Sequence, residues 1–66
     1  MSPRAKQVLK EARANHPEYK FRHRQCQELE GTPPRFIIDC QKIEPKGQWT
    51  PLGVWYDNEK DIPGNN

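Results

Sequence analysis

The chain has 66 residues, of which 32% are hydrophobic and 30% are charged. This length limits it to one small domain, and the low hydrophobic content predicts a small core and a marginal fold. No apolar run approaches the roughly 20 residues of a membrane span, and the first residues lack the charged-then-apolar pattern of a secretory signal. We therefore expect an intracellular protein, cytoplasmic or, in a eukaryote, nuclear, in which Cys26 and Cys40 are reduced and buried thiols.

Charge divides the chain into two parts. Residues 1–24 contain seven Lys/Arg and two Glu, a formal charge of +5, whereas residues 25–66 contain four Lys/Arg and seven acidic residues, a formal charge of −3. The net charge of +2 therefore averages a basic arm and a mildly acidic body. A basic arm of this kind predicts a binding site for a polyanion.

The basic arm begins with a helix signal. Ser2 is a good N-cap, and Pro3 suits the first helical position. Four apolar residues recur at the spacing of one helix face: Ala5, Val8, Leu9 and Ala12. A neighbouring face carries three cations: Lys6, Lys10 and Arg13. Because Pro17 disfavours helical geometry at His16, we expect the helix to run from about residue 3 to residue 14.

After Pro17 the pattern changes to strict alternation. Aromatic rings at Tyr19, Phe21 and His23 alternate with cations at Lys20, Arg22 and Arg24. An extended chain would place the rings on one side, where they could stack on bases or join the core, and the cations on the other. The alternative is a second helix from Pro17 to Glu30, ended by Gly31.

The acidic body reads as a β-hairpin. The segment RFIIDCQKI, residues 35–43, is rich in strand-forming residues, and the turn residues 44–48 separate it from a return strand at residues 48–56. Pro51 and Gly53 interrupt this return strand and indicate an edge position or a bulge. We predict a small α+β domain with a basic helix and extended arm at residues 1–24, a β-hairpin or three-stranded sheet at residues 25–57, and a frayed polar tail at residues 58–66.

Two segments resemble known families. His16-Pro17-Glu18-Tyr19-Lys20-Phe21-Arg22, within residues 5–24, resembles the end of an HMG box of the SOX and mating-type kind. This resemblance implies that Tyr19 and Phe21 pack the tail back on the helix and that Lys20, Arg22 and Arg24 lie along phosphates. The first two helices and the minor-groove wedge residues of an HMG box have no counterpart here, so the resemblance does not extend to DNA bending.

The second resemblance covers residues 20–57, which are similar to the central hairpin of the sixteenth small-subunit ribosomal protein family. The landmarks are Lys20-Phe21-Arg22, Leu52-Gly53 and Tyr56-Asp57. The alignment needs a one-residue gap, and the net charge is low for that family. This resemblance implies a place in a ribonucleoprotein.

We expect a non-enzymatic protein that binds the phosphate backbone of DNA or RNA. The expected binding residues are Lys6, Lys10, Arg13, Lys20, Arg22, His23 and Arg24. No Gly-rich phosphate loop, nucleophile elbow or paired carboxylate is present, so we expect no catalysis, no cofactor and no small-molecule substrate. We also expect no bound metal, because His16, His23, Cys26 and Cys40 lack the close ligand pairs of structural zinc sites, and no membrane partner, because no long apolar run is present. The alternative is a small regulator, an inhibitor or adaptor, whose hairpin docks on an acidic surface of a target protein through Trp49, Trp55 and Tyr56.

Overall fold

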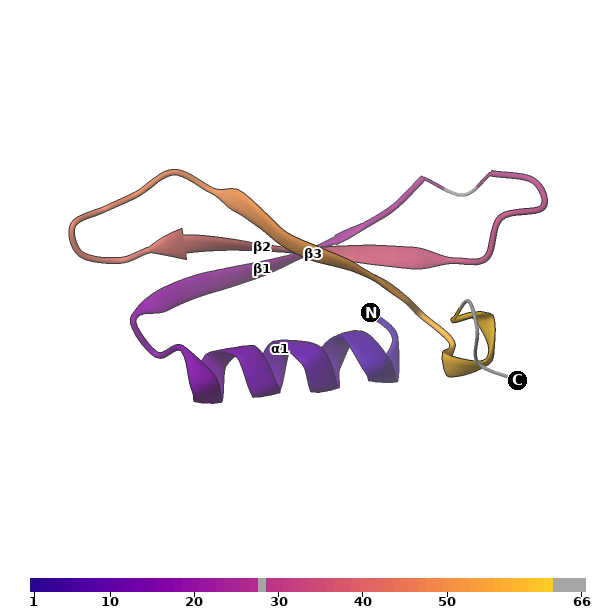
Figure 1. Ribbon diagram of the computed structural model, residues 1–66, viewed down its shortest axis with the longest axis horizontal. Coiled ribbons are helices and arrows are strands. Elements are labelled where there is room, and N and C mark those ends of the chain that lie inside the picture. Colours follow the sequence, from indigo (N-terminus) through magenta and orange to yellow (C-terminus); the bar gives the residue numbers. More distant parts are fainter. Residues whose placement is uncertain (28, 63–66) are drawn as a thin grey trace.

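The computed structural model describes residues 1–27 and 29–62. Its elements are α1 (Pro3–Asn15), β1 (Tyr19–Gln25), β2 (Arg35–Lys42), β3 (Thr50–Tyr56) and the 3-10 turn η1 (Glu59–Asp61). The strands form one antiparallel sheet in the order β1-β2-β3, and α1 lies along one face of this sheet (Figure 1). The α+β class is confirmed, and the sheet has three strands.

The start and end of α1 follow from capping. Ser2 Oγ accepts a hydrogen bond of 3.1 Å from the Ala5 amide, and Pro3 occupies the first turn, where no amide is needed. At the other end the His16 amide still donates to the Ala12 carbonyl at 2.9 Å. Pro17 follows directly, and the chain turns into β1. The extended conformation expected after Pro17 is therefore confirmed, and the alternative of a second helix is wrong.

Strand alternation decides what each face of the sheet carries. β1 pairs with β2 so that Phe21 lies opposite Cys40 and Arg22 lies opposite Asp39. Phe21 and Cys40 are on the face that α1 covers, and Arg22 and Asp39 are on the opposite face. Within the described ranges no helix packs on this second face, which we call the open face (Figure 1).

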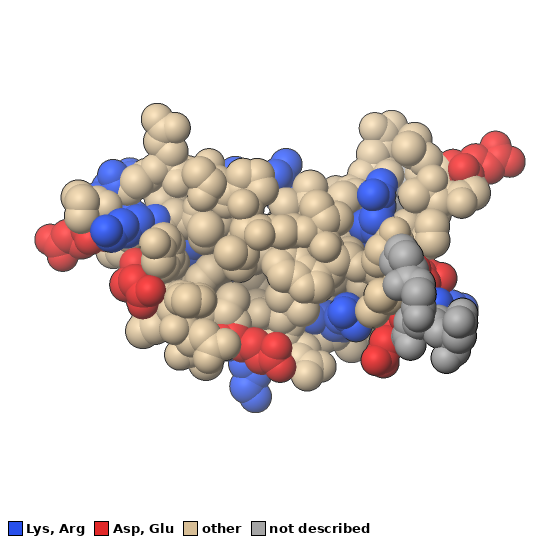
Figure 2. Space-filling model, in the orientation of Figure 1, with Lys and Arg blue, Asp and Glu red and all other residues tan. Residues whose placement is uncertain are grey.

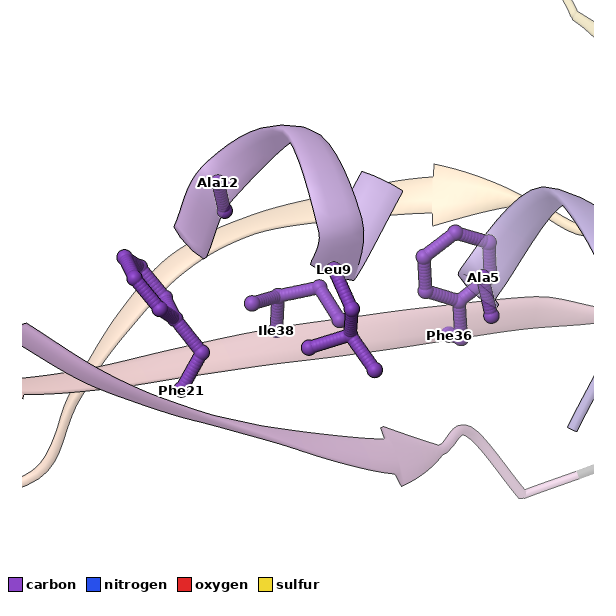
Figure 3. Packing of buried hydrophobic residues seen from close by; sticks show 6 residues of the cluster. All are labelled: Ala5, Leu9, Ala12, Phe21, Phe36 and Ile38. Atoms are coloured by element: carbon purple, nitrogen blue, oxygen red, sulfur yellow. The ribbon is translucent and has the colours of Figure 1, made fainter. Parts of the chain in front are cut away.

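The core lies between α1 and the sheet. It consists of six buried residues: Ala5, Leu9, Ala12, Phe21, Phe36 and Ile38 (Figure 3). Trp55 from β3 closes one end, with its ring stacked on Phe36 at a centroid separation of 5.8 Å and an interplanar angle of 11°. Cys26 and Cys40 form no disulfide and are half-buried, with Cys40 packed against the core, so the expectation of buried thiols is met only in part.

Two boundaries differ from the sequence-based expectation. The expected division between arm and body, at residues 24 and 25, falls inside β1, so both parts belong to one sheet. β3 begins at Thr50, two residues later than expected. Its pairing with β2 shifts register between Ile38 and Asp39, which confirms the expected interruption near Pro51 and Gly53. Of the tail expected to be frayed, residues 59–61 form η1, and residues 63–66 lie outside the described residues.

Candidate nucleic-acid interface

β1 presents its three cations on the open face. Because Phe21 points into the core, its neighbours on the strand point the other way: Lys20, Arg22 and Arg24. All three are exposed. Along a strand, the distance from the first to the third is about 13 Å.

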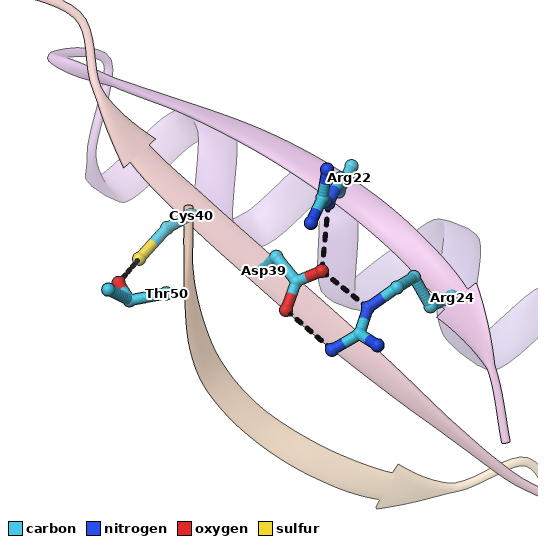
Figure 4. Close-up of polar contacts among 5 residues, drawn as sticks. All are labelled: Arg22, Arg24, Asp39, Cys40 and Thr50. Carbon is cyan, nitrogen blue, oxygen red and sulfur yellow. Dashed lines mark hydrogen bonds and ion pairs between the residues drawn. The ribbon is translucent and has the colours of Figure 1, made fainter. Parts of the chain in front are cut away.

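A buried carboxylate holds two of these cations. Asp39 Oδ2 accepts from the Nε of Arg22 at 2.8 Å and from the Nε of Arg24 at 2.6 Å, and Oδ1 accepts from Arg24 Nη2 at 3.0 Å (Figure 4). The Asp39 side chain is only 2% exposed, whereas those of Arg22 and Arg24 are 47% and 49% exposed. The hydrogen bonds from Arg24 and then Arg22 lower the pKa of Asp39, and the hydrogen bond to Asp39 raises the pKa of Arg24.

Trp49 completes this cluster. The guanidinium carbon of Arg22 lies 4.4 Å from the centroid of the Trp49 ring, which is a cation–π contact. Trp49 directly precedes β3. Its side chain crosses the central strand β2 and contacts Arg22 of β1. Arg22 is therefore fixed from two directions, by Asp39 and by Trp49.

The cations of α1 lie on the flank that adjoins β1. At about 100° per residue, Lys6, Lys10 and Arg13 fall on one side of the buried stripe of α1, and Arg4 and Glu11 fall on the other. Arg13 lines a shallow hollow of about 380 Å³ together with Lys20 and Trp49. This hollow joins the end of α1 to the outer edge of β1.

The six cations of α1 and β1 therefore follow a path from one flank of α1, round the outer edge of β1, to the open face. We call this set the basic side: Lys6, Lys10, Arg13, Lys20, Arg22 and Arg24. Arg4, the seventh cation of the arm, lies away from it in a hollow shared with Asp57 and Glu59, after the end of β3. Charged residues also surround the uncharged centre of the surface seen in Figure 2. The separation of charge along the sequence is only partly retained in the fold, because Asp39 lies between Arg22 and Arg24 and Arg4 lies beside Asp57 and Glu59.

The structure moves His23 away from the expected binding set. Its position in β1 places it on the face that α1 covers, where its ring lies 5.7 Å from that of Phe36. Phe21 is buried in the core and Tyr19 packs against the core, so these rings serve packing rather than base stacking. The expectation that His23 accompanies the cations is wrong because successive strand residues point to opposite faces.

The three aromatic residues expected to dock a protein lie on two faces of the sheet, with Trp55 on the core face and Trp49 and Tyr56 on the open face. Trp55 stacks on the core, Tyr56 follows it in β3 and points to the open face, and Trp49 lies on Arg22. Sequence reasoning also missed Asp39 as the acid that organises the arginines. The available signal was the single acid of this strand, which directly follows the apolar run Phe36-Ile37-Ile38 and accompanies a segment with alternating cations.

Two negative observations concern residues 1–27 and 29–62. No three of their His, Cys, Asp and Glu side chains gather closely enough to hold a metal ion. No helix within the same ranges combines the length and apolarity that crossing a membrane requires.

Comparison with known proteins gave no match. No protein-family model matches the chain, and neither a curated protein nor a solved structure matches it. The resemblances of residues 5–24 and 20–57 therefore remain predictions based on those residues.

Proposed function

We propose that this protein binds nucleic acid through contacts between its basic side and the phosphate backbone. The observation that carries the proposal is a path of six exposed cations from the flank of α1 to the open face of β1, connected by the hollow that Arg13 and Lys20 share. A polyanion that follows this path meets cations from two rigid elements, while Asp57 and Glu59 line a separate hollow beside Arg4.

The spacing of the cations suits a phosphate chain. Lys6 and Lys10 are separated by about 6 Å along α1, and Lys20 and Arg24 by about 13 Å along β1. Phosphates of one DNA strand advance by about 3.4 Å along the helix axis, so the cations of β1 span about four phosphate steps. The hollow at Arg13 and Lys20 connects the two rows. A phosphate chain that followed both rows would make five or six contacts.

Asp39 has a positioning role in this proposal. It uses the Nε atoms of both arginines and one terminal nitrogen of Arg24. Among the described residues, no partner is bonded to the terminal nitrogens of Arg22, which can therefore donate to phosphate oxygens. The carboxylate removes one unit of charge, but it fixes the orientation of two side chains that otherwise lose rotamer entropy on binding.

The contacts assigned here are to phosphates and carry no sequence information. We therefore propose binding with little sequence discrimination and without catalysis, either directly or as part of a ribonucleoprotein. Whether DNA or RNA is the ligand is an outcome of the experiment below.

The proposal is tested by fluorescence anisotropy with labelled duplex DNA, single-stranded DNA and RNA, between about 50 and 300 mM salt. Five phosphate contacts predict a slope of log Kd against log salt of about 4 to 5 on duplex DNA. The double variant Lys10→Glu/Lys20→Glu should reduce this slope by about two. It removes one cation from each row of the basic side.

The matched control is Lys46→Glu/Lys60→Glu. It changes the net charge by the same amount but alters the turn before β3 and η1, which lie outside the basic side. It should retain the wild-type slope. The absence of binding to all three nucleic acids at the lowest salt concentration would overturn the proposed function. An equal loss in both double variants would show that only net charge matters and would overturn the assigned site.

A further inference from the structure

The two outer strands of the sheet have very different edges. β1 carries three exposed cations, and charge is a common device by which proteins keep edge strands from pairing. The stretch 48–56, which contains β3, has no charged residue at all. It exposes Leu52 and Val54, which are 49% and 55% exposed. β3 is therefore the unprotected edge of the molecule.

The register identifies which backbone groups of β3 point outward. The Asp57 amide donates to the Pro34 carbonyl at 3.0 Å, so residue 57 directs its backbone groups toward β2. By strand alternation Trp55 and Gly53 do the same, whereas Tyr56 and Val54 direct their amides and carbonyls away from the sheet. Among the described residues, none lies beyond β3 to form hydrogen bonds with these outward amides and carbonyls.

Pro51 limits the available edge. It pairs with Asp39, whose own backbone groups point toward β1, so the nitrogen of Pro51 faces outward and has no hydrogen to donate. An added strand can therefore pair with Val54 and Tyr56 but not with the beginning of β3. The free edge is short and has a defined position.

We propose that β3 pairs antiparallel with β3 of a second copy of this chain, with Trp55 opposite Trp55 of that copy. In this register Val54 of each copy lies opposite Tyr56 of the other, and the outward groups of both residues form four reciprocal backbone hydrogen bonds. Each Val54 side chain then meets a Tyr56 ring on the open face, a favourable cross-strand pair. The product is a continuous six-stranded sheet with both helices on the same face.

The distribution of charge favours a second copy of this chain as the partner that pairs with β3. Because residues 48–56 are uncharged, two β3 strands bring no like charges opposite each other, whereas two β1 strands would oppose Lys20, Arg22 and Arg24. In the proposed register the two Asp57 residues are about 13 Å apart along the strand axis. That separation exceeds the screening length of about 8 Å at physiological salt. Self-pairing therefore meets little electrostatic opposition.

The two basic sides would lie at the outer edges of the dimer, so self-pairing leaves them free. Since one pair of strands is a small interface, we expect a reversible dimer rather than an obligate one. The inference depends on β3 alone and does not rest on the proposed function.

Sedimentation velocity of the full chain without nucleic acid, from about 10 µM to 1 mM, tests the inference. The weight-average mass should rise from monomer toward dimer. Val54→Lys should keep the chain monomeric, because it places a charge at the centre of the pairing strands. Ile43→Lys is the matched control, since Ile43 is another β-branched residue, 45% exposed, that lies outside β3. It should dimerise as the wild type does.

Amide hydrogen exchange of the wild-type chain gives a second measurement that needs no variant. The amides of Val54 and Tyr56 should become more protected as concentration rises. The outward amides of β1, such as that of Phe21, should not change. A monomer at 1 mM, a dimer unaffected by Val54→Lys, or exchange that slows at β1 instead of β3 would each overturn the inference.

Discussion

Arg24 and Asp39 form a two-point ion pair across the first two strands of the sheet. Nε and Nη2 of the arginine lie 2.6 and 3.0 Å from the two oxygens of the carboxylate (Figure 4). Arg22 adds a third hydrogen bond to the same carboxylate at 2.8 Å. A single acid thus accepts three charge-assisted bonds on a face that no helix within the described ranges covers.

This arrangement predicts a stability that falls in acid. Hydrogen bonds from Arg24 and Arg22 lower the pKa of Asp39, so its contribution is present above the ordinary Asp pKa of about 3.9 and is lost as the pH falls through the lowered value. Urea midpoints at pH 7, 5 and 3 should decrease most between the last two. Asp39→Asn should be less stable at pH 7 and should lose part of this dependence.

Glu30→Gln is the control for Asp39→Asn, because Glu30 is an exposed carboxyl group in the loop between β1 and β2. It should retain the wild-type dependence on pH. An unchanged acid slope in Asp39→Asn would show that other carboxyl groups cause the loss of stability.

The core is small enough that one leucine should decide whether the chain folds. Leu9 is 4% exposed and packs between α1 and the sheet, so Leu9→Ala should lower the free energy of unfolding by about 2–5 kcal/mol. Leu29→Ala makes the same chemical change at a residue that is 57% exposed and should cost less than about 0.5 kcal/mol. Urea denaturation followed by circular dichroism measures both. Similar losses in the two variants would contradict this description of the core.

The N-cap of α1 should be worth about 1 kcal/mol. Ser2→Ala removes the oxygen that accepts from the Ala5 amide and leaves that donor without its cap. Ser2→Asp keeps an acceptor and adds favourable charge at the helix N-terminus, so it should match or exceed wild-type stability. Thermal unfolding compares the three chains. An Ala variant as stable as the Asp variant would show that the cap contributes nothing.

Gly53 is needed for the position of the Trp55 ring. A Cβ at residue 53 would lie 3.1 Å from Cη2 and 3.4 Å from Cζ3 of this ring, which is itself stacked on Phe36. Gly53→Ala should displace the ring and cost about 1–3 kcal/mol, with a reduced near-ultraviolet circular dichroism signal. Gly47→Ala, whose Cβ would lie 3.4 Å from that of Lys42, should leave the signal intact. A normal signal in Gly53→Ala would mean that the ring is not confined.

Local sequence signals predicted the elements well because each depends on residues close together in the chain. Ser2, Pro3 and Pro17 set the limits of α1, expected at about residues 3–14 and found at Pro3–Asn15. The alternation after Pro17 predicted an extended segment, and this segment is β1. The same alternation explains why Phe21 joins the core while Arg22 does not.

The sequence by itself determined the helix, the strands and the separation of basic from acidic residues, because periodicity, capping and charge are local properties. Only the tertiary structure decided which distant side chains meet. The contact of Arg24 with Asp39 spans 15 residues, and that of Arg22 with Trp49 crosses the central strand. Both depend on strand order and register, which also leave β3 at an edge. Strand order and register follow from the burial of the apolar faces of all the elements in one core. No single segment of the sequence specifies this burial.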